Sequence, residues 1–207
     1  MVTDGLNPLT VLLFLGLVGG SLAAGAAWLL TLLAGKPALA TLILKLELAG
    51  LGAYAVLLLG AALTSRERVL VPGQEKHICE IDCHHAYSVI VVRSEQGTGG
   101  GTHYIVTVKV RFDEATISSH RGMAPLTPNS RRVALVDGRG RRYPGSHADL
   151  HRTLVPGESY RTDLAFDLPA GATDLRLLLA SDDWETRLLI GHENSFFHAK
   201  TAFRLGA

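Results

Sequence analysis

Two apolar stretches decide the fold of the N-terminal third of this chain: LTVLLFLGLVGGSLAAGAAWLLTLLA at Leu9–Ala34 and ALATLILKLELAGLGAYAVLLLGAAL at Ala38–Leu63. Each is longer than the roughly 20 residues that a helix needs to cross a hydrocarbon core of about 30 Å. Only the short polar break Gly35–Pro37 separates them, so two such helices must run antiparallel. The sequence therefore predicts a transmembrane helical hairpin, with residues 1–8 as an N-terminal tail.

The chain of 207 residues has a formal net charge of +1, and 47% of its residues are apolar. These values fit one anchored domain rather than two full globular domains. The leader Met1–Pro8 carries only Asp4 as a charged side chain, whereas a cleaved signal peptide begins with a basic region. We therefore expect both spans in the mature protein. The near-neutral charge gives no electrostatic case for a nucleic-acid partner.

The hairpin contains small residues at four-residue spacing, and a charge inside its second span. Gly16 and Gly20 belong to a small-residue face of the first span, which allows helix backbones to approach closely in lipid. Such a face could pack the hairpin against itself or dock a larger membrane complex. Lys45 can snorkel to an interface, but Glu47 is too short to do so. Glu47 therefore indicates that the second span faces a membrane-protein partner.

Residues 74–207 have the pattern of an all-β domain. At His103–Phe112 and Ser159–Leu168 apolar and polar residues alternate, which is typical of half-buried strands. Glycine- and proline-containing turns such as Pro156–Glu158 separate these and several shorter candidates. The spacing predicts an antiparallel β-sandwich of seven or eight strands.

Four motifs in this domain resemble the immunoglobulin-like, telokin-like domains of bacterial cell-envelope proteins of unknown function. They are VTVKVRF, RRVALVDGRGRRY, LVPGESYRTDLAFDLP and DLRLLL, and the resemblance covers roughly Thr102–Leu179. It implies an immunoglobulin-like sandwich and an extracytoplasmic location, but no activity, because this fold has many functions.

The orientation of the hairpin follows from these arguments together. Lys36 in the hairpin break and the group Arg66, Arg68 and Lys76 after the second span lean slightly towards a cytoplasmic domain. The N-terminal tail, which has no basic residue, leans the other way. By analogy with envelope domains, we expect the β domain on the periplasmic or extracytoplasmic side of the inner membrane.

One constellation could carry chemistry, and it opens the β domain: His77, Cys79, Glu80, Asp82, Cys83, His84 and His85. In an extended strand the two cysteines would lie about 13 Å apart, too far for a disulfide or a shared metal. A strand from Lys76 to Glu95 would be unusually long, so we expect a turn near Asp82–His85.

Four alternatives remain open for this cluster. The first is a copper or zinc site made by both thiolates with imidazoles from His84, His85, His192 or His198. The second is a Cys79–Cys83 disulfide in an oxidising compartment. The third is haem attachment at Cys79–His84, although the usual motif has two residues between its cysteines rather than three. The fourth is a pair of buried thiols among scattered histidines.

The metal alternative has a parallel in topology. A membrane hairpin followed by a β domain with Cys-x-x-x-Cys is similar to the second subunit of haem-copper oxidases, in which two thiolates bridge a dinuclear copper centre. In that family the cysteine pair lies late in the β domain, whereas here it opens the domain. The histidine expected four positions after the second cysteine is Tyr87 here, and the only methionine after the first residue, Met123, is in a different loop.

The sequence contains no nucleophile-elbow, zinc-protease or phosphate-loop motif, so we predict a protein that is not an enzyme. The long loop at His120–Ser130 is stiffened by Pro125 and Pro128 and contains Met123, which makes it a candidate partner surface. The expected function is that of a membrane-anchored accessory or interaction protein. A copper- or zinc-binding redox or metal-delivery module is the alternative.

Overall fold

The structure is a computed structural model that describes residues 2–5, 7–79, 83–97, 100–117, 122–145 and 150–206. The chain forms two compact units. The first comprises Met1–Gly5, Arg66–Trp184 and Ala199–Ala207, and the second comprises Leu6–Ser65 and Glu185–His198.

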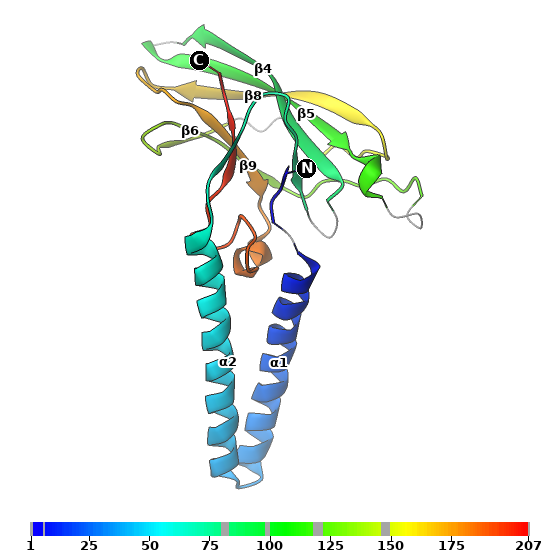
Figure 1. Cartoon of the computed structure of the whole chain (residues 1–207), viewed down its shortest axis with the longest axis vertical. Coiled ribbons are helices and arrows are strands. Elements are labelled where there is room, and N and C mark those ends of the chain that lie inside the picture. The colour runs from blue at the N-terminus through cyan, green and yellow to red at the C-terminus, as the bar shows by residue number, and fades with distance from the viewer. Residues whose placement is uncertain are drawn as a thin grey trace. The chain divides into compact units, whose positions relative to one another are not determined.

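The second unit is built on two antiparallel helices, α1 (Pro8–Leu33) and α2 (Pro37–Thr64), so the predicted pair of apolar helices is confirmed (Figure 1). Each begins with a proline, which fits the first helical turn because its missing N–H has no partner there. Asn7 caps α1 by accepting a hydrogen bond from the Leu9 amide at 2.9 Å. Both helices are long and apolar enough to cross a membrane.

The segment Glu185–His198 belongs to the unit of the helices, although the sequence-based division places it in the β domain. It begins within the 3₁₀ helix η3 (Trp184–Leu188) and continues as turns. The Tyr54 hydroxyl of α2 donates a hydrogen bond of 2.6 Å to the Leu188 carbonyl. Tyr54, Leu58 and Ala62 are buried, so one face of the last third of α2 is covered, while neighbouring residues such as Val56 and Leu63 remain exposed.

The first unit consists of two five-stranded sheets. One has the order β1-β3-β4-β5-β8, with β1 (Val2–Thr3), β3 (Lys76–Ile78), β4 (His85–Gln96), β5 (Thr102–Phe112) and β8 (Ser159–Leu168). The other has the order β2-β10-β9-β6-β7, with β2 (Arg68–Leu70), β10 (Thr201–Arg204), β9 (Arg176–Ser181), β6 (Arg131–Val136) and β7 (Arg142–Pro144). Among the described strands, the pairs β1–β3 and β2–β10 are parallel and the others are antiparallel. A short 3₁₀ helix, η2 (Glu114–Thr116), follows β5.

The described residues thus form ten strands, more than the seven or eight predicted. The difference arises partly because β1 and β2 lie before residue 74, in the segments assigned to the tail and to the linker. A strand of two or three residues shows no alternation in the sequence, so its pairing is decided by the sheet that it joins.

The core lies between the two sheets, as the alternation predicts. Along β5 the side chains of Val106, Val108, Val110 and Phe112 are almost fully buried, while their neighbours remain partly exposed. The inward faces of β8 and β9 contribute Leu164, Phe166, Leu177 and Leu179 to the same cluster. The burial of one face per sheet confirms the sandwich architecture.

Two cations connect the sheets through the core. Lys76 on β3 is fully buried, and its Nζ donates to the Leu179 carbonyl of β9 at 2.6 Å and to the Thr201 carbonyl of β10 at 3.4 Å. The Nε of Arg131 on β6 donates to the Tyr87 hydroxyl of β4 at 3.0 Å. Because each bond joins one sheet to the other, these side chains fix the relative position of the two sheets.

Candidate binding site beside the disulfide

Cys79 and Cys83 form a disulfide, with their Cα atoms 4.0 Å apart. Strand β3 ends at Ile78, and the antiparallel strand β4 begins at His85, so the chain reverses between them. This reversal brings together two cysteines that an extended strand would hold far apart. Glu80 and Asp82, two members of the predicted cluster, lie outside the described residues.

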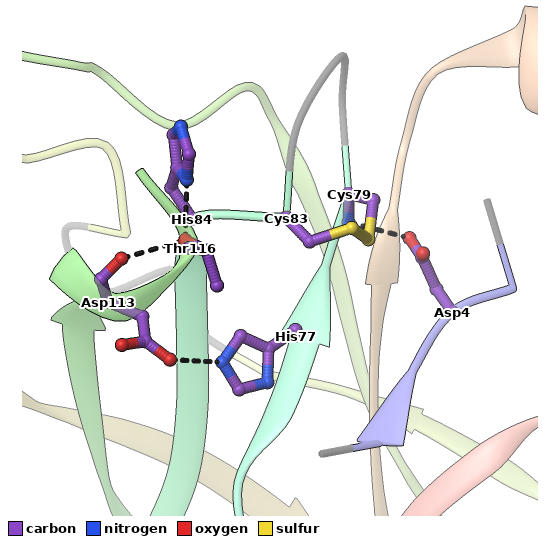
Figure 2. Close-up of a disulfide and its surroundings, with 7 residues drawn as sticks. All are labelled: Asp4, His77, Cys79, Cys83, His84, Asp113 and Thr116. Atoms are coloured by element: carbon purple, nitrogen blue, oxygen red, sulfur yellow. Dashed lines mark hydrogen bonds and ion pairs between the residues drawn. A yellow bond between two sulfur atoms is a disulfide. The ribbon is translucent and has the colours of Figure 1, made fainter. Parts of the chain in front are cut away.

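The N-terminal strand holds the start of this reversal. The Asp4 amide donates to the His77 carbonyl at 3.2 Å, and the Asp4 Oδ2 accepts the Cys79 amide at 3.0 Å (Figure 2). Asp4 is only 2% exposed, and it thus satisfies a backbone donor at the disulfide. Val2–Gly5 of the predicted tail therefore belong to the β domain.

On the other side of β3, His77 contacts Asp113, the residue that caps η2 (Figure 2). Its Nε2 lies 2.9 Å from Asp113 Oδ2. Because an ionised carboxylate only accepts hydrogen bonds, this nitrogen carries a proton. In a ring with one proton, Nδ1 is then left as an acceptor. His77 is 3% exposed, and its Nδ1 makes no hydrogen bond within the described part of the chain.

Arg111 connects Asp113 to a second carboxylate. Its Nε and Nη2 donate to both oxygens of Glu75 at 3.0 and 2.7 Å, and its Nη1 donates to Asp113 Oδ1 at 3.0 Å. The bidentate hydrogen bond from Arg111 lowers the pKa of Glu75, although burial opposes this. Burial would raise the pKa of Asp113, but hydrogen bonds from Arg111, His77 and the Ala115 amide outweigh it and lower the pKa to about 2.

These groups border an open cavity of about 500 Å³, lined by Val2, Gly73, Gln74, Glu75, His77 and Asp113. Two ionised carboxylates and an imidazole acceptor line it, and the guanidinium of Arg111 is engaged with both carboxylates. The cavity thus has acceptors in excess of free donors. This chemistry suits a ligand that presents N–H or O–H groups.

The other histidines of the cluster are engaged elsewhere. The His84 ring lies 5.2 Å from that of Phe112 in a stacked arrangement, and its Nδ1 lies 2.6 Å from Thr116 Oγ1 (Figure 2). The His85 ring is tilted against the same Phe112 at 5.6 Å. Both histidines are buried and pack the end of β5.

The disulfide is the alternative for the cysteine cluster that the structure contains. A disulfide sulfur is not a thiolate, so the copper, zinc and haem alternatives would need the reduced chain. His192 and His198, the other candidate ligands, belong to the helical unit, where His192 Nδ1 accepts the Asn194 amide at 3.0 Å. Among the described residues no three His, Cys, Asp or Glu side chains gather as a metal site. Metal binding by reduced Cys79 and Cys83 stays a prediction.

Within the hairpin, Glu47 has a partner in the same chain. The Ser21 hydroxyl of α1 donates to its carboxylate. The pair borders a cavity of about 190 Å³ between the helices. Gly16 and Gly20 are exposed, and a Cβ on either would meet nothing within 4 Å. These glycines therefore do not pack the hairpin against itself, and their docking role stays a prediction.

The predicted partner loop is only partly available on the surface. Met123 is 66% exposed and Pro125 is exposed, but Pro128 is buried. Leu126 and Leu154 exchange two backbone hydrogen bonds, which hold the middle of this loop against the domain. Pro128 is thus buried against the domain, and a partner contact by this loop stays a prediction.

Acid is expected to destabilise the β domain through Asp113. The pKa of Asp113 is about 2 in the folded chain and near 3.8 in an unfolded one. The stabilisation by its ionised carboxylate is therefore fully present above about pH 4 and is lost between about pH 4 and 2. We expect the unfolding free energy of Asp113→Asn to fall by about 1 kcal/mol less than that of the wild type between pH 6 and pH 3. Urea unfolding at pH 3 and pH 6 measures it. Equal pH dependence in the wild type and the variant would contradict the assignment.

No protein-family model matches the chain. No curated protein matches it either. Among solved structures, it is similar to MPT63, a secreted protein of Mycobacterium tuberculosis, with 12% identity and a TM-score of 0.43 over 69% of this chain and all of that one. It is also similar to the YjhA protein of Bacillus subtilis, with 14% identity and a TM-score of 0.39 over 66% of this chain and 99% of that one. These likenesses assign the chain to no family and to no activity.

Proposed function

We propose that this chain is a membrane-anchored accessory protein, which holds an immunoglobulin-like β-sandwich outside the inner membrane and binds a membrane-protein partner. The observation that carries the binding role is the buried His77 imidazole at the cavity, whose Nδ1 has no hydrogen-bond partner in the described part of the chain. Leaving such a group unsatisfied costs free energy, and a bound donor would recover it.

The anchoring part of the proposal is supported by the two apolar helices, of 26 and 28 residues, each with many exposed leucines. In water such exposed apolar surfaces would favour aggregation, whereas in lipid they are the expected exterior of a spanning helix. The hairpin leaves the first unit after Gly5 and returns to it at Arg66, so the β domain is attached at both ends of the hairpin.

The extracytoplasmic location is supported by the disulfide. Disulfides persist in oxidising compartments and are rare in the reducing cytoplasm. The orientation is testable with single cysteines introduced into the full chain in spheroplasts, because the native pair is bonded and does not react. We expect an impermeant maleimide to label Met123→Cys from outside, and Lys36→Cys only after permeabilisation. The reverse pattern would contradict the proposed side.

The binding role is testable by site-specific crosslinking in native membranes. A photoreactive residue at Gln74, which lines the cavity, is expected to give a discrete adduct with a membrane protein. The same residue at Lys109 on β5 serves as the matched control position. Adding His77→Phe to the Gln74 probe is expected to reduce the adduct at least fivefold.

Two results would contradict the binding role. One is a Gln74 adduct no stronger than that from Lys109. The other is an adduct unaffected by His77→Phe in a chain that unfolds like the wild type. In either case the cavity is not the contact surface.

A further inference from the structure

We propose that the segment Glu185–His198, called here the interface loop, lies at the membrane surface and inserts Phe196 and Phe197 between lipid headgroups and the upper acyl chains. This inference rests on the proposed insertion of the hairpin in a bilayer. It concerns a lipid contact that is separate from the His77 cavity.

The position of the loop along α2, and so its depth in the bilayer, follows from one hydrogen bond between the Tyr54 hydroxyl and the Leu188 carbonyl. At a rise of about 1.5 Å per residue, Tyr54 lies about 26 Å along α2 from Pro37. A hydrocarbon core of about 30 Å that starts at the hairpin turn therefore ends just beyond Tyr54. The 28 residues of α2 span about 42 Å, so its last turns extend past this boundary.

A bilayer displaced towards Thr64 does not fit the same contact. In that register Tyr54 and the turns of the interface loop would lie deep in hydrocarbon. Irregular backbone that faces lipid is not tolerated at that depth. The loop therefore fixes where the near membrane surface crosses α2, and it leaves Glu47 about 15 Å from Pro37, near the middle of the core.

Several polar groups of the loop form hydrogen bonds within it, which gives the loop a compact polar interior. Asn194 Nδ2 donates to Thr186 Oγ1 at 3.1 Å, and the Ser195 hydroxyl donates to the Leu189 carbonyl. Backbone bonds close successive turns, including His192 to Leu189 and Ser195 to His192. His192, Asn194 and Ser195 are at most 5% exposed.

The two phenylalanines of the loop are exposed, whereas Leu189 is buried. Phe196 is 48% exposed and Phe197 is 78% exposed. Phe197 also has φ +63, in the left-handed region that residues with a bulky side chain avoid. Exposing both phenylalanines, one of them on strained backbone, gains nothing in water. At an interface, phenylalanine side chains of this kind bury their apolar surface in the acyl boundary.

The test is depth-dependent fluorescence quenching of the full chain in vesicles of phosphatidylcholine and phosphatidylglycerol at 3:1. Trp28→Phe and Trp184→Phe remove the native indoles, and Phe197→Trp supplies one reporter. The vesicles carry lipid with a nitroxide on acyl carbon 5 or on acyl carbon 16. We expect at least twofold stronger quenching by the carbon-5 label, with a blue-shifted emission.

Leu46→Trp in the same background is the matched control, since Leu46 is 65% exposed and adjoins Glu47. Its indole is expected to be quenched more by the carbon-16 label. If it is not quenched, the hairpin does not span the bilayer and the proposed anchoring fails. If it is quenched but Phe197→Trp is unquenched, or is quenched more by the carbon-16 label, only the interfacial position of the loop is overturned.

Discussion

Lys76→Ala is expected to lower the free energy of unfolding of the β domain by about 3–5 kcal/mol. The change removes a fully buried ammonium that bonds to the Leu179 and Thr201 carbonyls of the opposite sheet. It leaves buried acceptors without this donor and opens a cavity between the sheets, and both effects act in the same direction. Urea unfolding of the detergent-solubilised chain measures the loss, with the β-sheet circular dichroism band at about 218 nm as the signal.

Two further variants separate the contributions. Lys76→Met keeps most of the side-chain volume and loses only the charged donor, so its loss should be smaller than that of the alanine variant. Lys109→Ala, on the same sheet but partly exposed, should change stability by less than about 0.5 kcal/mol. If Lys76→Ala behaves like Lys109→Ala, then Lys76 does not hold the sheets together.

The double replacement Cys79→Ser and Cys83→Ser is expected to cost about 2 kcal/mol of stability. The disulfide closes a loop of only five residues, and the chain-entropy relation gives about 2 kcal/mol for a loop of that size at 25 °C. Replacing the fully buried Cys79 with a hydroxyl adds to the loss. The melting temperature with and without reductant measures the effect.

The double variant also provides the control for reduction. Reductant should shift the melting temperature of the wild type towards that of the variant, and should leave the variant unchanged. A wild type that mass spectrometry shows to be reduced, yet melts as before, would mean that the disulfide does not brace the domain.

The features that the sequence predicts well are those set by local patterns. The two helices can be predicted from the length and hydropathy of two stretches, because an apolar stretch of that length is stable only in lipid or inside a protein core. The core faces of β5 and β8 follow from a two-residue period that leaves one face to water. Neither prediction requires knowing which residues, far away in the sequence, pack against these segments.

The candidate site could not be predicted in the same way, because long-range register assembles it. His77 is visible in the sequence as one of several clustered histidines, but Asp113 and Arg111 are brought to it by the pairing of β3, β4 and β5. Asp113 directly follows the buried Phe112, where the alternation of β5 ends. A charged residue directly after the buried, alternating residues of β5 is the sequence signal that points to Asp113.

The interface loop was missed for a related reason. Its sequence after β9 reads as another connection of the sandwich, and its place beside the helices follows from three-dimensional contacts such as the hydrogen bond with Tyr54. Lys76 is comparable, since a lysine next to a run of polar residues reads as a solvent-exposed side chain, and the carbonyls that bind it come from two remote strands.

The pairing of β1 with β3 has a consequence for the order of biosynthesis. Val2–Thr3 leave the ribosome before the hairpin, yet their partner Lys76–Ile78 is made only after both helices. In a chain anchored as proposed, β1 must reach the same side of the membrane as β3 before the two can pair, because α1 and α2 lie between them in the chain. In such a chain, completion of the sheet, and with it the Asp4 bond at the disulfide, is therefore a late step that follows insertion of the hairpin.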